Sequence, residues 1–312
     1  MWQVYNMHIN RAKEIKTMKK IIAIILVAML TMVCFGAAAE EKKVLTVALS
    51  PDFAPMEFID TSKSGQDQYV GFDVTLAKFI ADELGMDLEI KAMSFDACQT
   101  AVQTGSVDLA ISGFSWTEAR AENFYLSDYY YAGDNETEQV IITTADKAGA
   151  FSTADDFSGL TVGCQDASLQ ADLCNSQLPI DCTIKPFKAI DDAILSLMSG
   201  KIDAVAVAKG NADAIIANND SIAFSGFEFE VSAEAQNNVI LIQKGNDELL
   251  ANVNACLAKA YDQGLYAVWY EDAKALAGIE TAAEVTIEDE ATEAPAEEEA
   301  PAEESSDEGA ED

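Results

Sequence analysis

From residue 44 to residue 276, short apolar runs alternate with longer amphipathic segments. The run VLTVALS at 44–50 predicts a buried strand. Residues 71–84 (GFDVTLAKFIADEL) repeat apolar positions at helical spacing, and the glycine that follows them is typical of a helix C-terminus. A strand at 87–93, a helix at 95–103 and a strand at 107–112 are predicted next. The first part of the chain therefore alternates strand with helix.

The alternation begins again after a polar break near residue 136. Further strands are predicted at 139–144, 160–164, 182–186, 202–207 and 238–243, and further helices at 167–175, 190–198, 212–218, 247–262 and 265–276. Such alternation favours an α/β fold with mostly parallel sheets that carry helices on both faces. We expect two lobes, with residues 44–142 and 238–278 in lobe 1 and residues 143–237 in lobe 2. Ligands of such folds bind outside the carboxyl ends of the strands, which here predicts a cleft between the lobes.

The N-terminus has the features of a processed leader, which we assign to residues 1–39. Two lysines follow Met18, residues 21–33 form an apolar run, and residues 37–39 are three alanines that suit a cleavage site. An uncleaved membrane anchor is the alternative, since the run extended to Ala39 approaches the minimum spanning length. Cys34 raises a second alternative, a lipid anchor, although Val33 stands where a small residue is expected. All three readings predict an exported protein.

Charge is spread unevenly along the 312 residues. The net charge is −35, and residues 284–312 hold 14 acidic residues and no basic one. A segment of this composition buries too little apolar surface to offset its ordering entropy, so we expect residues 279–312 to form a disordered acidic tail. The overall negative charge argues against nucleic acid and anionic membrane surfaces as partners, because both would repel the protein.

Cysteine and histidine exclude several kinds of chemistry. The only histidine, His8, lies in the predicted leader, which removes Ser-His and Cys-His nucleophiles and imidazole metal sites. None of the five cysteines after the leader forms a CxxC pair, so zinc-ribbon and thioredoxin readings have no support. A local disulfide between Cys174 and Cys182 is the pairing we favour. The odd count leaves at least one free thiol, and the alternative is that all five are free. We expect no cofactor and no metal.

Arg120 is the only arginine after the leader, in the stretch SGFSWTEAR. A guanidinium offers a planar fork of donors that binds a carboxylate bidentately, which lysine cannot do. A surface ion pair with Glu118 or Glu122 is the plain alternative. A carboxylate clamp is the functional interpretation of this residue.

Four segments, taken together in order, resemble the family 3 extracellular solute-binding proteins, which serve ABC importers of polar amino acids. They are residues 51–58 (PDFAPMEF), 71–77 (GFDVTLA), 110–131 (from AISGFSWTEAR to YLSDYYY) and 200–205 (GKIDAV). Thr75 replaces an acid that is usual in the family. The resemblance spans residues 44–276 and implies a two-lobed fold with the ligand between the lobes.

The resemblance also implies roles for individual residues. Arg120 would bind the ligand's α-carboxylate with two hydrogen bonds, and Ser115 would add its hydroxyl and backbone N–H. Gly113 would turn a carbonyl toward the α-ammonium, and Phe53 would pack on the ligand's side chain. Ser168, at the start of a helix, would offer further donors to the carboxylate. The structural alternatives are a core position for Phe53, a helix cap for Ser168 and a strand end for Ser115.

One position departs from the family. Where the family usually has an aspartate that pairs with the ligand's ammonium, this chain has Ala208, followed by Lys209. We consider three accounts. Asp166 or Glu57 replaces the missing carboxylate, the register shifts toward Asp213, or the ligand is not an α-amino acid. Asp166 is our first choice, because it shares a loop with Ser168.

These residues together predict a binding protein and not an enzyme. It would capture a small carboxylate-bearing solute of the polar amino-acid class at the cell surface or in the periplasm, and pass it to a membrane permease. We expect a monomer. The alternatives are a dehydratase or lyase on the same scaffold, which would need paired carboxylates with separated pKa values, and the sensing module of a receptor.

Overall fold

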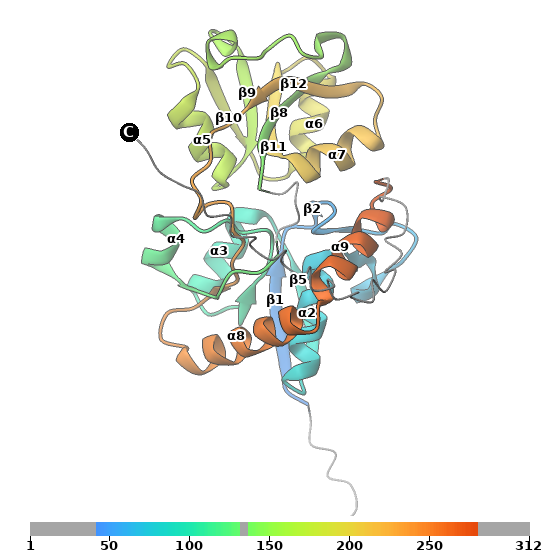
Figure 1. The fold of residues 1–312 in the computed structure, drawn as a ribbon, viewed down its shortest axis with the longest axis vertical. Coiled ribbons are helices and arrows are strands. Elements are labelled where there is room, and N and C mark those ends of the chain that lie inside the picture. Colours follow the sequence, from blue (N-terminus) through green and yellow to red (C-terminus); the bar gives the residue numbers. More distant parts are fainter. Residues whose placement is uncertain (1–41, 132–136, 280–312) are drawn as a thin grey trace, which may run out of the picture. The chain divides into compact units, whose positions relative to one another are not determined.

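The computed structural model describes residues 42–131 and 137–279. The predicted leader, Cys34 and the acidic tail from residue 280 onward lie outside these residues. Two five-stranded sheets and one three-stranded sheet organise the described chain (Figure 1). An α/β fold with sheets between helices, as expected, is confirmed.

The first large sheet has the strand order β5-β1-β6-β13-β7. Its strands are β1 (Val44–Leu49), β5 (Asp87–Ala92), β6 (Leu109–Ala110), β7 (Tyr125–Leu126) and β13 (Leu241–Ile242). β1 runs parallel to β5 and β6, whereas β13 is antiparallel to both β6 and β7. The sheet is therefore mixed, because the strand that returns from the C-terminal part of the chain enters it in the opposite direction.

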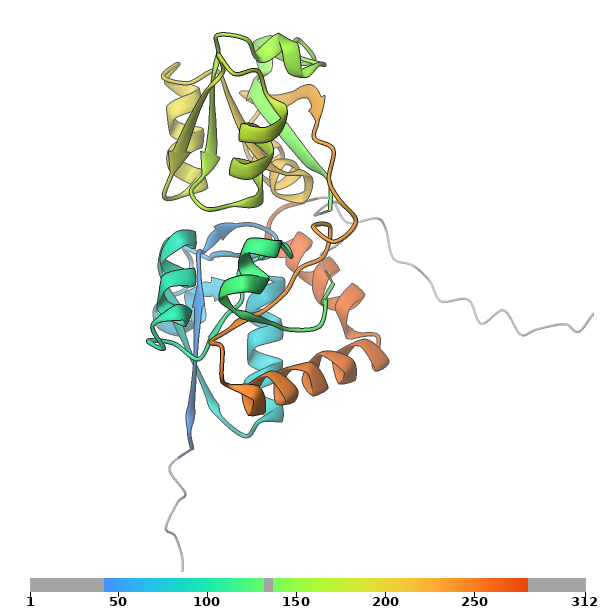
Figure 2. The same cartoon turned by 90° about the vertical axis from the view of Figure 1, so that its left-hand side faces the viewer.

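Helices cover both faces of this sheet, as Figure 2 shows on the two sides of the blue strand β1. They are α2 (Phe72–Glu83), α3 (Phe95–Gln103), α8 (Asp247–Asp262) and α9 (Leu265–Leu276). Leu45 and Val47 of β1 pack with α2, α8 and α9, while Ala48 packs with α3. Because alternate residues of β1 face opposite helical layers, the strand is apolar on both faces.

The second large sheet has the order β10-β9-β11-β8-β12. Its strands are β8 (Gln139–Thr144), β9 (Thr161–Gln165), β10 (Thr183–Phe187), β11 (Ala204–Ala208) and β12 (Ile222–Glu228), and its helices are α5 (Leu169–Gln177), α6 (Ile190–Met198) and α7 (Lys209–Ala217). Val162 and Ala204 pack on the side of α5, whereas Val205 and Val207 pack with α6 and α7. β8 is antiparallel to β11 and β12, so this sheet is mixed as well.

Short elements complete the fold. They are β2 (Asp52–Phe53), β3 (Glu57–Ile59), β4 (Tyr69–Val70), α4 (Glu118–Asn123) and the 3-10 helices Gly65–Gln68, Ala145–Lys147 and Ala154–Phe157. β8 belongs wholly to the second sheet, so the predicted lobe boundary at residue 142 falls inside a strand. The division into lobes at these residue numbers stays a prediction. None of the described helices is both long enough and apolar enough to span a bilayer.

The cysteine prediction is wrong for the favoured pair. Cys174 and Cys182 are both free and buried, as are the other three cysteines of the described chain. Cys174 of α5 instead packs in the same core cluster as Cys164 of β9. Proximity in sequence suggested the bridge, and the thiols of Cys174 and Cys182 do enter the same apolar core cluster, but they are not bonded to each other.

Candidate functional site

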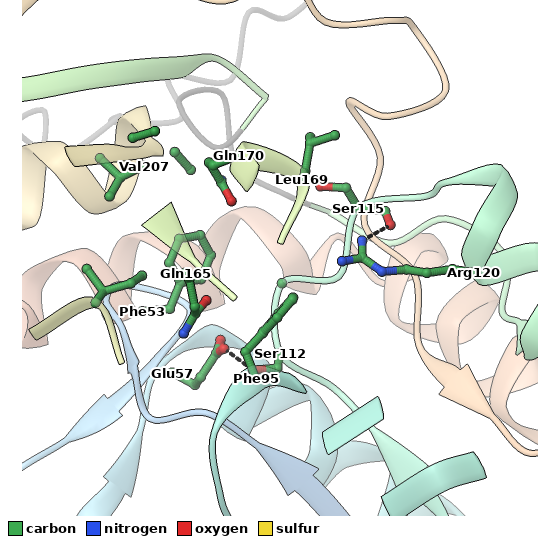
Figure 3. A pocket seen from close by; sticks show the side chains of 14 residues that line it. Phe53, Glu57, Phe95, Ser112, Ser115, Arg120, Gln165, Leu169, Gln170 and Val207 are labelled. Carbon is green, nitrogen blue, oxygen red and sulfur yellow. Dashed lines mark hydrogen bonds between the residues drawn. The ribbon is translucent and has the colours of Figure 1, made fainter. Parts of the chain in front are cut away.

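A small pocket lies at the carboxyl ends of β1, β6, β9 and β11 (Figure 3). This is the position that the α/β pattern predicts for a ligand. Its lining comes from both large sheets and consists of Phe53, Glu57, Phe95, Ser112, Gly113, Ser115, Arg120, Gln165, Leu169, Gln170, Ile190, Ala206, Val207 and Ala208. The cavity measures about 20 Å³, room for about one water molecule. A larger molecule can enter only if the walls separate.

Arg120 is the buried cation of this pocket and is only 5% exposed. Thr117 caps the short helix α4 by accepting from the backbone N–H of Arg120 at 3.2 Å, which fixes where the side chain starts. The guanidinium donates to the carbonyl of Ser115 at 2.5 Å and to that of Ala167 at 3.1 Å. It also lies over two rings, 5.5 Å from the centroid of Phe95 and 5.3 Å from that of Phe114.

No acidic side chain in the described chain forms an ion pair with Arg120. Burial lowers the pKa of its guanidinium to about 10, so the group remains charged at neutral pH. Two neutral carbonyls, two ring faces and the more distant charge of Asp172 compensate this charge only partly. A buried cation without a counter-ion is costly, and an entering anion would relieve that cost. The plain alternative, a surface ion pair with Glu118 or Glu122, is excluded by the burial.

Three other predicted residues line the same pocket. Ser115 is 9% exposed and lies next to the guanidinium through its own carbonyl. Gly113 has a φ of +54°, and its N–H donates to Asp73 at 2.7 Å. An added Cβ at Gly113 would lie 2.6 Å from the Phe53 ring, so the glycine allows that ring to approach the loop. Phe53, Gly113, Ser115 and Arg120 are thus brought together.

Ser168 and Asp166 lie outside the pocket lining. The Ser168 hydroxyl donates to the carbonyl of Gln165 at 2.7 Å and accepts from the N–H of Ala171 at 3.2 Å, which makes it the cap of α5. Asp166 accepts from Lys188 at 2.8 Å, and the same ammonium contacts Asp96 at 2.6 Å. The structural alternative for Ser168 is therefore realised, and the acid of Asp166 is already paired.

The wall formed by β11 is apolar where the family usually carries an aspartate. Ala206, Val207 and Ala208 line it, and Lys209 beside them pairs with Asp213 at 2.9 Å. Glu57 is thus the acid among the lining residues, and its Oε1 accepts from the Ser112 hydroxyl at 2.5 Å. The pocket combines a buried cation at one side with an apolar wall and a buried acid elsewhere.

Several lining residues were not singled out from the sequence. Gln165 ends β9 and donates to Asp52 at 3.2 Å, and Ile190 begins α6 with an N–H that donates to Asp52 at 2.6 Å. The signal for Gln165 was its position directly after the predicted strand 160–164, and that for Ile190 was its position at the start of the predicted helix 190–198. No cluster of histidine, cysteine or acidic residues in the described chain could hold a metal ion.

A buried arginine between two α/β sheets, at the ends of their parallel strands, is the arrangement of a two-lobed solute-binding protein. The chain belongs to the bacterial extracellular solute-binding proteins, family 3, whose sequence model matches residues 45–272. The family consists of binding proteins, so the enzyme alternative is not supported.

Relatives with a named ligand agree with this family. The chain is 29% identical over 225 residues to the arginine-binding extracellular protein ArtP of Bacillus subtilis, covering 72% of this chain and 83% of ArtP. It is 25% identical over 213 residues to a probable histidine-binding protein of Campylobacter jejuni, covering 65% and 78%. An L-arginine-bound substrate-binding protein, AbpA of Streptococcus pneumoniae, superposes with a TM-score of 0.69 at 32% identity, covering 76% of this chain and 97% of AbpA.

Proposed function

We propose that the protein captures a small carboxylate-bearing solute of the amino-acid class and delivers it to an ABC permease. The observation that carries this proposal is the buried guanidinium of Arg120, which lacks an acidic partner within the described chain. A carboxylate that replaces its two carbonyl contacts would gain bidentate, charge-assisted hydrogen bonds. The named ligands of the relatives, arginine and histidine, support the substrate class.

Opening and closing of the pocket is part of the proposed mechanism. The walls come from both sheets and enclose about 20 Å³, so solute entry requires them to separate. Contacts between the two walls then have to break and form again with each binding event. A binding protein whose closed form is stabilised by its ligand works by such a shift in population.

Asp52 is the first of these contacts that we would test. α6 starts after Ala189, which has no side chain able to cap a helix, and the first N–H of α6 donates to Asp52 of β2. Asp52→Ala is expected to lower solute affinity on the order of tenfold, because a hydrogen bond to a charged group is lost in the closed form. Hydrogen exchange at the Ile190 amide should show less solute-induced protection than in wild type. Asp67→Ala, which removes an exposed acid, is the control; equal protection in both variants would contradict the contact.

Gly113 provides a second test, directed at the ring that packs beside it. Gly113→Ala is expected to reduce solute affinity by about tenfold, since the new methyl group would displace Phe53 and overpacking of this kind costs ~1–3 kcal/mol. Gly65→Ala is a matched control, because its φ is +65° with no atom within 4 Å of the added Cβ. The comparison is made by titration calorimetry. Similar losses in the two variants would show that backbone strain, not the ring, is responsible.

Titration calorimetry with a panel of amino acids and other small carboxylates tests the proposed function directly. We expect at least one carboxylate to bind and its uncharged amide to bind far more weakly. Binding of amides and carboxylates alike would contradict a site built on Arg120. Product analysis of the same mixtures checks that the solute is returned unchanged.

Surface retention and partners follow from the proposed role. We propose export through the leader at residues 1–39 and action as a monomer with a membrane permease. Lipid attachment at Cys34 would hold the protein at the surface, and mass spectrometry of the mature protein tests it.

Deletion of residues 280–312 should leave affinity unchanged, because a segment that is so rich in acidic residues and poor in apolar ones is expected to remain outside the fold.

A further inference from the structure

Two acidic side chains are completely buried beneath residues 112–115, a loop that contributes to the pocket lining. Glu57 of β3 and Asp73 of α2 are both 0% exposed. Glu57 Oε1 accepts from the Ser112 hydroxyl at 2.5 Å. Asp73 Oδ2 accepts from the N–H of Gly113 at 2.7 Å and from the Tyr130 hydroxyl at 3.1 Å. Both acids therefore hold neighbouring residues of the loop 112–115.

The second carboxyl oxygen of each acid accepts no hydrogen bond from a donor in the described chain. Glu57 Oε2 and Asp73 Oδ1 are buried without a hydrogen-bond partner in the described chain. The two carboxyl groups nevertheless lie side by side, because they bind successive residues of one loop, Ser112 and Gly113, and each influences the pKa of the other. Two buried carboxylates at this separation repel unless a proton lies between them. The missing donor is supplied if one acid is protonated.

We propose that Glu57 carries a proton and donates it to Asp73, and that this pair positions the loop 112–115. This loop includes Ser115, whose carbonyl accepts a hydrogen bond from the guanidinium of Arg120. The expected effect of the pair on solute binding therefore rests on the proposed function. Glu57 is the proton carrier because Asp73 already accepts two hydrogen bonds that stabilise its charged form. Neither acid contacts the solute's carboxylate in this arrangement; each acts through the loop.

The surroundings of the pair favour the proton. Burial, and next the charge of Asp73, raise the pKa of Glu57 well above its usual value. Burial also raises the pKa of Asp73, to about 7. Asp52 adds to the effect on Glu57, and the neighbouring Tyr130 and Cys98 are neutral groups whose own pKa values are raised by burial. Within residues 42–131 and 137–279, neither acid forms an ion pair with a lysine or arginine.

Retention of this proton in the folded protein makes stability depend on pH in a definite direction. The folded protein keeps the proton on Glu57 at pH values where the unfolded chain, with an ordinary glutamate, has released it. Stability therefore falls as pH rises, from about pH 5 upward, because the native state binds more protons than the unfolded state. Each proton held only in the native state raises the unfolding equilibrium constant about tenfold per pH unit.

Two isosteric variants remove the need for this proton. In Glu57→Gln the amide N–H can donate to Asp73, and in Asp73→Asn the amide can donate to an ionised Glu57. We therefore measure the free energy of unfolding in urea between pH 5 and 8. Its pH dependence should show that each variant releases at least one proton fewer on unfolding than wild type does. Asp82→Asn, at an exposed position of the same helix, should keep the wild-type dependence. If both amide variants showed the same pH dependence of the free energy of unfolding as wild type, the shared proton would be excluded.

Solute affinity tests the positioning role separately. Asp73 does not line the pocket, and Asp73→Asn keeps an oxygen that can accept from Gly113 and Tyr130, whereas Asp73→Ala does not. We expect the alanine variant to lose at least about tenfold in affinity and the asparagine variant to recover most of that loss. Equal affinities would overturn the positioning role. If no carboxylate binds wild type, the proposed function fails, while the unfolding experiment still decides whether the pair shares a proton.

Discussion

Replacing Arg120 with alanine is expected to weaken binding of the carboxylate solute by at least about a hundredfold. Removing one partner of a buried, charge-assisted pair typically costs ~3–5 kcal/mol. The fold should persist, because within the described chain the hydrogen bonds of the guanidinium go to the carbonyls of Ser115 and Ala167, and its ring contacts are with Phe95 and Phe114. Titration calorimetry gives the affinity, and urea unfolding without solute gives the stability.

Arg120→Lys separates charge from geometry. Lysine keeps the positive charge but has no planar fork, so it should recover only a minor part of the lost affinity. Lys63→Ala, which removes an exposed cation paired with Asp60, is the control for net charge. An affinity of Arg120→Ala within threefold of wild type would exclude the clamp.

The long, strongly periodic segments were predicted from the sequence because their patterns are independent of distant parts of the chain. Helices α8 and α9 begin and end at the predicted residues, 247–262 and 265–276. Short elements such as β2 and β7 were missed, since two residues carry no periodicity. The antiparallel direction of β8 and β13 was also missed, because strand direction depends on how the chain returns to each sheet.

The candidate site was predicted in part for similar reasons. Arg120 was conspicuous by composition, and its burial in the pocket agrees with the clamp that remains to be tested. Asp166 was chosen because it is near Ser168 in sequence, but its partner is Lys188, which comes from beyond β10. The pairing of Glu57 with Asp73 joins β3 to α2 and depends on tertiary packing. No local pattern indicates that two such acids meet.

Recognition of the solute's ammonium leads to the second large expected effect. The acids considered for it are already engaged, since Asp166 pairs with Lys188, Asp213 pairs with Lys209, and Glu57 is bound by Ser112. We therefore expect wild type to bind an amino acid and its analogue without the α-amine with affinities within about threefold. Asp166→Asn should leave this ratio unchanged.

Ala208→Asp is expected to raise the preference for the amino acid over its des-amino analogue by about 10- to 100-fold. Ala208 lines the pocket at the end of β11, where the resembling family usually has an aspartate. A hydrogen bond between an ammonium and a carboxylate contributes ~1.5–3 kcal/mol, which corresponds to that change in affinity ratio.

Ala208 is also the residue before α7 and provides no side-chain cap, so an aspartate there could cap the helix instead. Ala208→Asn is the matched control, because asparagine caps a helix about as well but brings no charge. A change in affinity ratio with aspartate and not with asparagine would assign the effect to the ammonium. If wild type already strongly prefers the amino acid, an acid of this pocket accepts the ammonium, and Glu57, the acid that lines it, becomes the residue to replace.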